Sequence, residues 1–156
     1  MSISRWITSA VGIGLVVLYA AGSGIWVSSA GQWYRSLSAP PWQPPDWVFG
    51  VIWPYNFIVL GISSVIVSQR LSTKLSIIWI VVFAFSVTCA LTWAYQFYKP
   101  HNLTAASMAL TLAALSTVPL LYITYKASVP SFLAFVPYQL WITTASFLSW
   151  GYSQRN

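Results

Sequence analysis

Long uncharged and mostly apolar runs dominate the pattern along this chain. The charged residues that separate them are Arg5, Arg35, Asp46, Arg70, Lys74, Lys99, Lys126 and Arg155. A helix needs about 20 predominantly apolar residues to cross the hydrocarbon core of a bilayer, and five of the intervals are long enough. The pattern therefore predicts five transmembrane helices, near residues 6–28, 47–68, 76–97, 104–125 and 131–152.

One connection between these helices is long. Residues 29–46, SAGQWYRSLSAPPWQPPD, contain four prolines and cannot continue either neighbouring helix. The other connections are short, so neighbouring helices run antiparallel. Strands are not expected, because the strands of a membrane barrel show short alternating segments rather than continuous apolar runs. We predict an all-α membrane protein, a single five-helix bundle over residues 1–156 with a Trp/Pro-rich loop between its first two spans.

Composition narrows the function classes. Apolar residues make up 58% of the chain and charged residues 5%, against about 25% charged residues in soluble domains. This disfavours a soluble enzyme, a disordered tail and a nucleic-acid-binding domain. Seven basic residues accompany one acid, so paired carboxylates for acid–base chemistry, metal binding or ion-coupled transport are absent. We expect no catalytic residue, no metal site and no obligatory cofactor.

The basic residues also bear on orientation. Arg5, Arg70, Lys74 and Lys126 fall on the side of the N-terminus, and Arg35, Lys99 and Arg155 fall on the other side with Asp46. The positive-inside rule then favours a cytoplasmic N-terminus. Five spans put the two termini on opposite sides of the membrane. We expect a multi-pass integral protein, in the cell membrane if the source is a bacterium.

Single polar residues have simple structural interpretations. Asp46 directly precedes the second span, which predicts an N-cap carboxylate. Asn102 is interpreted as the cap of the fourth span. Cys89 lies in mid-span and is expected to be a small buried residue. We interpret His101 as a solvated loop residue rather than a haem ligand, because no second axial ligand is placed opposite it.

The ten tryptophans exceed what a membrane anchor needs. Trp and Tyr are enriched at membrane interfaces, which accounts for those near span ends, namely Trp6, Trp26, Trp33, Trp47, Tyr98, Trp150 and Tyr152. Trp53, Trp93 and Trp141 lie inside the spans, so interfacial anchoring explains them less well. Pocket lining and ordinary helix packing both remain open for these three side chains.

Three sequence segments carry a family resemblance. WYRSLSAPPWQPPDWVFGVIW (residues 33–53) resembles the signature of the tryptophan-rich sensory protein family, also called TspO/MBR or translocator proteins. ALTWAY around Trp93 and PYQLW at 137–141 are similar to the family's third and fifth helices. Length, span count and the long first loop agree, so the resemblance covers essentially the whole chain.

The resemblance implies both a fold and a ligand class. Family members form a five-helix bundle that often dimerises and binds tetrapyrroles such as protoporphyrin IX and haem. Animal members also bind cholesterol and synthetic isoquinoline carboxamides and benzodiazepines. The family is associated with tetrapyrrole transport, sensing or disposal under stress, including light-dependent porphyrin breakdown that needs no conventional catalytic site.

The residues themselves are compatible with a pocket for a flat ligand. At about 1.5 Å per residue, Trp53, Trp93 and Trp141 lie roughly 6 to 16 Å below the face that carries the long loop. Residues three, four or seven apart share one helix face, which groups Tyr138 with Trp141 and Ala145. With the resemblance, the candidate ligand-binding residues are Tyr34, Trp42, Trp53, Phe57, Trp93, Phe97, Tyr138, Trp141 and Ala145.

A tetrapyrrole also has carboxylates, which need cations at the rim. Arg35 and Lys99 lie on the loop side, and we expect propionates to reach them through charge-assisted hydrogen bonds. Thr88 and Thr92 stand where relatives commonly have amides, so polar ligand contacts from the third span would be made by hydroxyls.

Two further expectations concern a sterol and a dimer. Leu148, Tyr152 and Arg155 fit the loose cholesterol motif of a Leu or Val, a Tyr and a basic residue. Small residues four apart, Ala90 with Ala94 and Ala20 with Gly24, allow close approach of helices. By resemblance, we expect the third span to form the face of a homodimer. A membrane scaffold or assembly subunit without a tetrapyrrole ligand is the alternative function.

Overall fold

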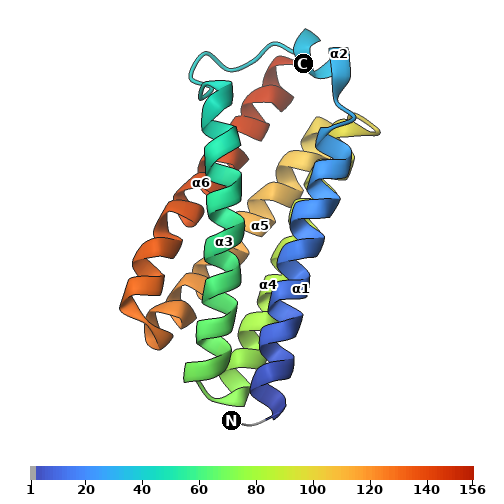
Figure 1. Ribbon diagram of the computed structural model, residues 1–156. Helices are drawn as coiled ribbons and strands as arrows, with labels where there is room; N and C mark the ends of the chain where they lie inside the picture. Colours follow the sequence, from blue (N-terminus) through green and yellow to red (C-terminus); the bar gives the residue numbers. More distant parts are fainter. Residues whose placement is uncertain (1–2) are drawn as a thin grey trace.

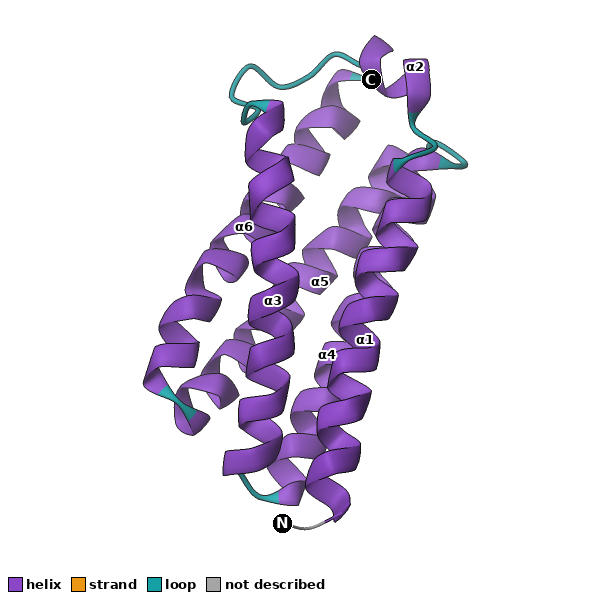
Figure 2. Cartoon of the chain, in the orientation of Figure 1, coloured by secondary structure: helices purple, strands orange, loops and turns teal. Residues whose placement is uncertain are grey.

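Five long helices account for most of the structure. The computed structural model describes residues 3–156, in which all regular secondary structure is helical (Figure 2). The five helices long and apolar enough to cross a membrane are α1 (Ile3–Val27), α3 (Asp46–Arg70), α4 (Thr73–Tyr98), α5 (Leu103–Ala127) and α6 (Val129–Arg155). The predicted all-α fold with five spans is confirmed, and each predicted boundary lies within three residues of the observed one.

The long connection contains a helix that the sequence pattern did not predict. Helix α2 (Gly31–Ser36) forms in the first half of residues 29–46. The four prolines all lie in the second half of this segment, from Pro40 onward, so they do not prevent a helical turn before them. Together, α2 and residues 37–45 cross one end of the bundle (Figure 1); we call this segment the lid.

The helix caps agree with the sequence in one case and differ in another. Asn102 Oδ1 accepts a hydrogen bond from the Ala105 N–H at 3.0 Å, which confirms the predicted cap of α5. The prediction that Asp46 caps α3 is wrong. Pro45 occupies the cap position in an extended conformation, and Asp46 is already the first helical residue with no capping hydrogen bond.

Long helices that follow one another in the chain run antiparallel, whereas α1 and α4 lie side by side and run in the same direction (Figure 1). The most extensive interface joins α4 to α5, followed by α5 with α6, while α1 packs against both α4 and α3. Helix α1 begins and α6 ends at opposite ends of the bundle (Figure 1). Ala90 and Ala94 of α4 are 1% and 0% exposed, so this pair is buried within the protomer. These two small residues therefore do not supply an outward face of α4, and the expectation that the third span forms a dimer face stays a prediction.

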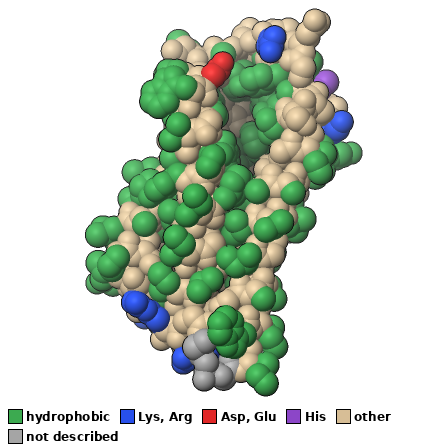
Figure 3. Space-filling view, viewed as in Figure 1, with side chains coloured by type: hydrophobic (Ala, Val, Ile, Leu, Met, Phe, Trp, Pro, Cys, Tyr) green, Lys and Arg blue, Asp and Glu red, His purple; other side chains and the backbone are tan. Residues whose placement is uncertain are grey.

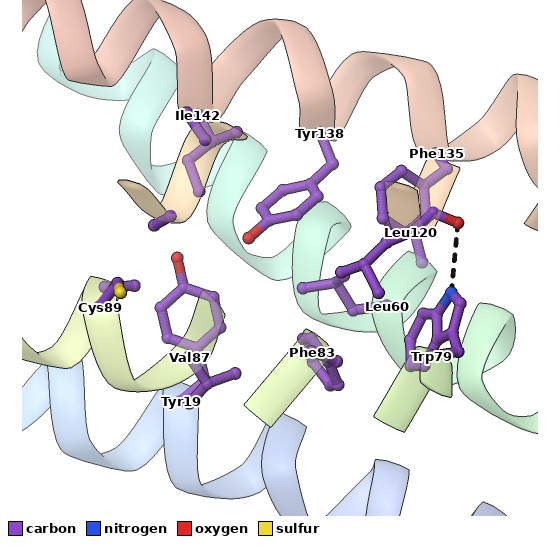
Figure 4. Close-up of a cluster of buried hydrophobic side chains, with 14 of the residues drawn as sticks. Tyr19, Leu60, Trp79, Phe83, Val87, Cys89, Leu120, Phe135, Tyr138 and Ile142 are labelled. Carbon is purple, nitrogen blue, oxygen red and sulfur yellow. Dashed lines mark hydrogen bonds between the residues drawn. The ribbon is translucent and has the colours of Figure 1, made fainter. Parts of the chain in front are cut away.

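The apolar core lies toward the end of the bundle away from the lid. Figure 4 shows Trp79, Phe83, Leu120 and Phe135 converging there. The Trp79 Nε1–H donates to the Leu120 carbonyl at 3.2 Å and to Thr124 Oγ1 at 3.1 Å, which ties α4 to α5. Since a bilayer offers little hydrophobic driving force between helices, such packing and hydrogen bonds hold the bundle together.

Helices α1 and α3 approach closely at Gly12, which gives a test of the packing. A Cβ at Gly12 would lie 2.6 Å from both Cβ and Oγ of Ser64. We expect Gly12→Val to destabilise the protein by about 1–3 kcal/mol through overpacking. A thermal unfolding curve in detergent measures this. Gly14→Val is the control, because a Cβ at Gly14 meets nothing within 4 Å; equal stability of the two variants would contradict the close approach.

Candidate functional site

A cavity of about 520 Å³ lies inside the bundle beneath the lid. Its opening is visible as a hollow in the space-filling view (Figure 3). Its lining comes mainly from α1, α3, α4, α6 and the lid. The lining residues are Tyr19, Ala20, Ser23, Gly24, Val27, Ala30, Tyr34, Asp46, Phe49, Trp53, Phe57, Trp93, Phe97, Tyr98, Trp141, Ala145, Leu148, Ser149 and Tyr152. Ten of these side chains are aromatic, so the cavity presents mainly ring faces and edges.

The structure brings together seven of the nine residues that the sequence suggested for ligand binding. These are Tyr34, Trp53, Phe57, Trp93, Phe97, Trp141 and Ala145. Trp42 does not line the cavity; it is 49% exposed in the lid. Tyr138 does not line it either, because its ring is fully buried in the apolar core against Phe135, 5.5 Å away. Its hydroxyl points toward that of Tyr19 (Figure 4).

The three intramembrane tryptophans are held in different ways. The Trp53 ring stacks on Phe57 at 5.8 Å and meets Trp141 edge-on at 6.5 Å. Trp93 Nε1–H donates to Ser149 Oγ at 3.2 Å, which fixes that indole between α4 and α6. Trp141 Nε1 is buried without a hydrogen-bond partner among the described residues. A buried donor left unpaired costs about 1–3 kcal/mol, so it is available to a polar atom of a bound molecule.

Sequence reasoning missed the contribution of α1. Tyr19, Ala20, Ser23 and Gly24 line the cavity from this helix. The sequence suggested that Ala20 and Gly24 allow close packing of helices, yet a Cβ at Gly24 would meet nothing within 4 Å. These small residues leave space instead. The i, i+4 spacing of these small residues, beside Tyr19 and Ser23, was the sequence signal for a cavity wall on α1. It was not decisive, because small residues occur both at tight helix interfaces and beside cavities.

Two aromatic residues at span ends belong to the cavity rather than to an interfacial belt. Tyr98 and Tyr152, interpreted above as anchors, both line it. Trp6 and Trp47 remain 59% and 71% exposed, as expected of anchors. The position of a residue along a span therefore did not determine whether its ring faces lipid or the cavity.

Aromatic contacts fasten the lid over the cavity. Tyr34 of α2 packs against Tyr98 at 6.1 Å and Tyr152 at 5.8 Å between ring centroids. Trp33 stacks on His101 at 3.6 Å with the two rings nearly parallel. His101 is exposed, as predicted for a loop residue, but the stacking was not foreseen. It links the lid to the α4–α5 connection.

Hydrogen bonds from the end of α6 hold the lid at a second place. The Tyr152 hydroxyl contacts Tyr34 Oη at 3.2 Å and donates to Gln43 Oε1. The Ser38 N–H donates to Asn156 Oδ1 at 2.8 Å, and Asn156 Nδ2 donates back to the Ser38 carbonyl at 3.2 Å. The lid is thus tied to α6 through both side chains and backbone.

The charges near the cavity lie partly in its lining and partly outside it. Arg35 and Lys99, expected to receive ligand carboxylates at the rim, are exposed outside the lining, and that role stays a prediction. Among residues 3–156, Asp46 is the only charged residue that lines the cavity. Among residues 3–156, no three His, Cys, Asp or Glu side chains gather to hold a metal ion. Cys89 is buried as predicted.

The threonines of α4 and the residues of the sterol pattern do not lie where the sequence suggested. Thr88 and Thr92 are exposed on α4, outside the cavity, and their hydroxyls donate to carbonyls four residues earlier. They do not supply polar ligand contacts there. Leu148 and Tyr152 of the sterol pattern are 7% and 4% exposed and face the cavity, so the pattern does not form a lipid-facing surface.

Comparison with known proteins agrees with this architecture. The sequence profile described as the TspO/MBR family matches residues 10–155. The chain is 30% identical to the tryptophan-rich protein TspO of Chlorobaculum tepidum, over 96% of each chain. It is 30% identical to protein CrtK of Rhodobacter capsulatus, over 90% of this chain and 89% of the relative. Identity to the translocator protein of Bos taurus is 24%, over 88% and 79% respectively. The fold, the Trp-lined cavity and these matches show that the chain belongs to the TspO/MBR family.

Proposed function

We propose that the protein binds a tetrapyrrole, such as protoporphyrin IX or haem, in the cavity beneath the lid. The observation that carries the proposal is the aromatic cavity of about 520 Å³ around Trp53, Trp93 and Trp141. This volume falls within the roughly 300–1,000 Å³ typical of sites for small molecules and cofactors. Aromatic walls favour a flat, apolar ring system, which gains contact area against the ring faces and edges.

Ring-shaped ligands other than tetrapyrroles belong to the same proposal. A sterol or an isoquinoline-type compound is also flat or compact and largely apolar, so the cavity chemistry supports both. For a sterol, the cavity is the site we propose, since Leu148 and Tyr152 face inward. The bound ring needs no metal and no catalytic residue from the protein.

The biological role that we propose is sensing, transport or light-dependent disposal of the bound tetrapyrrole. The names of relatives support a role of this kind, since they include a tryptophan-rich sensory protein of Cereibacter sphaeroides and translocator proteins of animals. The proposed setting is the cell membrane of a bacterium, with the N-terminus in the cytoplasm. A homodimer through α4 would use outward-facing residues such as Phe85 and Tyr95, which are 52% and 46% exposed.

Tryptophan fluorescence tests the proposal directly. The purified protein in an uncharged detergent is titrated with protoporphyrin IX, haem, a bilin and cholesterol. We expect saturable quenching by the tetrapyrroles, because Trp53, Trp93 and Trp141 surround the bound ring. A small tryptophan derivative in the same detergent controls for absorption of light by the ligand. A flat response to all four compounds would contradict the proposal and favour a scaffold or assembly subunit.

A further inference from the structure

The lining of the cavity carries one formal charge, and it is negative. Asp46 is the only acid in the sequence and, in the part of the chain that the structure describes, the only charged side chain that lines the cavity. It lies in the first turn of α3, close to the lid. Within residues 3–156 its carboxylate has no hydrogen-bond or ion-pair partner. The charge is therefore not neutralised by the protein, although the chain as a whole carries a net charge of +6.

The aromatic walls add to this negative character. The face of an aromatic ring is electron-rich and attracts cations, most strongly for Trp. Trp53, Trp93 and Trp141 lie in the same cavity as the Asp46 carboxylate. A carboxylate and several ring faces form a favourable environment for an organic cation, whereas a second carboxylate brought near Asp46 is repelled.

The basic residues do not offset Asp46 inside the cavity. Arg35 lies on α2 and Lys99 follows α4, and both side chains are exposed outside the lining. A ligand group that contacts the cavity wall at Asp46 thus meets that carboxylate directly, whereas both cations lie outside the lining.

We infer that Asp46 makes the cavity select flat ligands by charge, binding an aromatic ring with an ammonium group more tightly than the same ring with carboxylates. This rests on the proposed function insofar as the cavity must first bind a ring. For a dicarboxylate such as protoporphyrin IX, it also sets the orientation. The propionates point away from Asp46, and the apolar edge of the ring lies near it.

Three derivatives of one porphyrin test this selection because they share the ring and differ in charge. They are protoporphyrin IX, its neutral dimethyl ester, and a diamide whose two side arms carry trimethylammonium groups. Affinities are measured by tryptophan quenching in an uncharged detergent for the unaltered protein and for Asp46→Asn. The substitution keeps the size of the side chain at an exposed position of the first helical turn.

We expect Asp46→Asn to weaken binding of the ammonium derivative by about two- to fivefold and to tighten binding of the dicarboxylate by a similar factor. The ester should bind both proteins equally. Gln32→Lys is the matched control, since it raises the net charge by the same one unit from an exposed position on α2, outside the cavity. It should change none of the three affinities.

Two different failures are distinguishable in this experiment. If all three porphyrins bind and Asp46→Asn changes none of them, or changes them no more than Gln32→Lys does, the charge selection is overturned while ring binding stands. If none of the three quenches the unaltered protein, the proposed function fails, and the selection fails with it because no ring enters the cavity.

Discussion

Replacement of Ala145 by Phe is expected to weaken the binding of protoporphyrin IX strongly, so that quenching saturates only at much higher ligand concentration. Ala145 lines the cavity from α6, one helical turn beyond Trp141. A benzyl side chain at this position occupies space that the ring would fill. Overpacking of an occupied site costs about 1–3 kcal/mol, which corresponds to a loss of affinity of roughly ten- to hundredfold. Titration of tryptophan fluorescence against protoporphyrin IX measures the change.

Leu140→Phe provides the control for this variant. It introduces the same side chain on the same helix, at a position that is 64% exposed and faces away from the bundle. We expect its affinity to match that of the unaltered protein. If Ala145→Phe binds protoporphyrin IX as tightly as Leu140→Phe does, the ring is bound somewhere other than the cavity.

The largest loss of stability is expected from Trp79→Ala. The Trp79 side chain is fully buried, lies 5.0 Å from the Phe83 ring between centroids, and donates to Leu120 and Thr124 of α5. Its removal leaves a cavity and deprives two acceptors of their donor. Deletion of a buried Trp side chain costs about 3–5 kcal/mol. In a chain of this size, this lowers the midpoint of thermal unfolding by roughly 6–20 °C.

Trp47→Ala is the control for Trp79→Ala, because it removes an exposed indole instead of a buried one. Trp47 is 71% exposed at the start of α3, and we expect Trp47→Ala to leave the unfolding midpoint in detergent nearly unchanged. Similar midpoints for the two alanine variants would contradict the packing of α4 against α5 described here. A milder substitution, Trp79→Phe, keeps an aromatic ring in the core. Because Trp79 does not line the cavity, this variant should keep its affinity for protoporphyrin IX even as its stability falls.

Helix positions followed from the sequence because the membrane imposes a strong constraint. Charged residues are costly in the hydrocarbon core, so their positions delimit the spans. This is why α1 and α3 to α6 coincide with uncharged intervals between residues such as Arg70, Lys99 and Lys126. Helix α2 was missed because proline content was read over the whole connection, although its first half contains none.

Depth along a helix was also predictable, whereas direction around its axis was less so. The rise per residue places Trp53, Trp93 and Trp141 in the same half of the bilayer, and the structure gathers them around one cavity. Tyr138 shares a helix face with Trp141 by spacing, yet its ring points into the apolar core. One face of a helix contacts several neighbouring helices, and only the packing of the bundle determines which helix or cavity each side chain on that face meets.

The sequence alone determined that this protein lies in lipid, how many times it spans the membrane, which half of the bilayer holds its inner tryptophans, and where its long loop falls. These properties depend on hydropathy and on the fixed rise of a helix, which are local. The tertiary structure decided which residues of α1 open the cavity, which rings close it, and that Asp46 rather than Arg35 or Lys99 lines it. Those outcomes depend on how each helix is rotated against its neighbours, and close packing between distant segments sets that rotation.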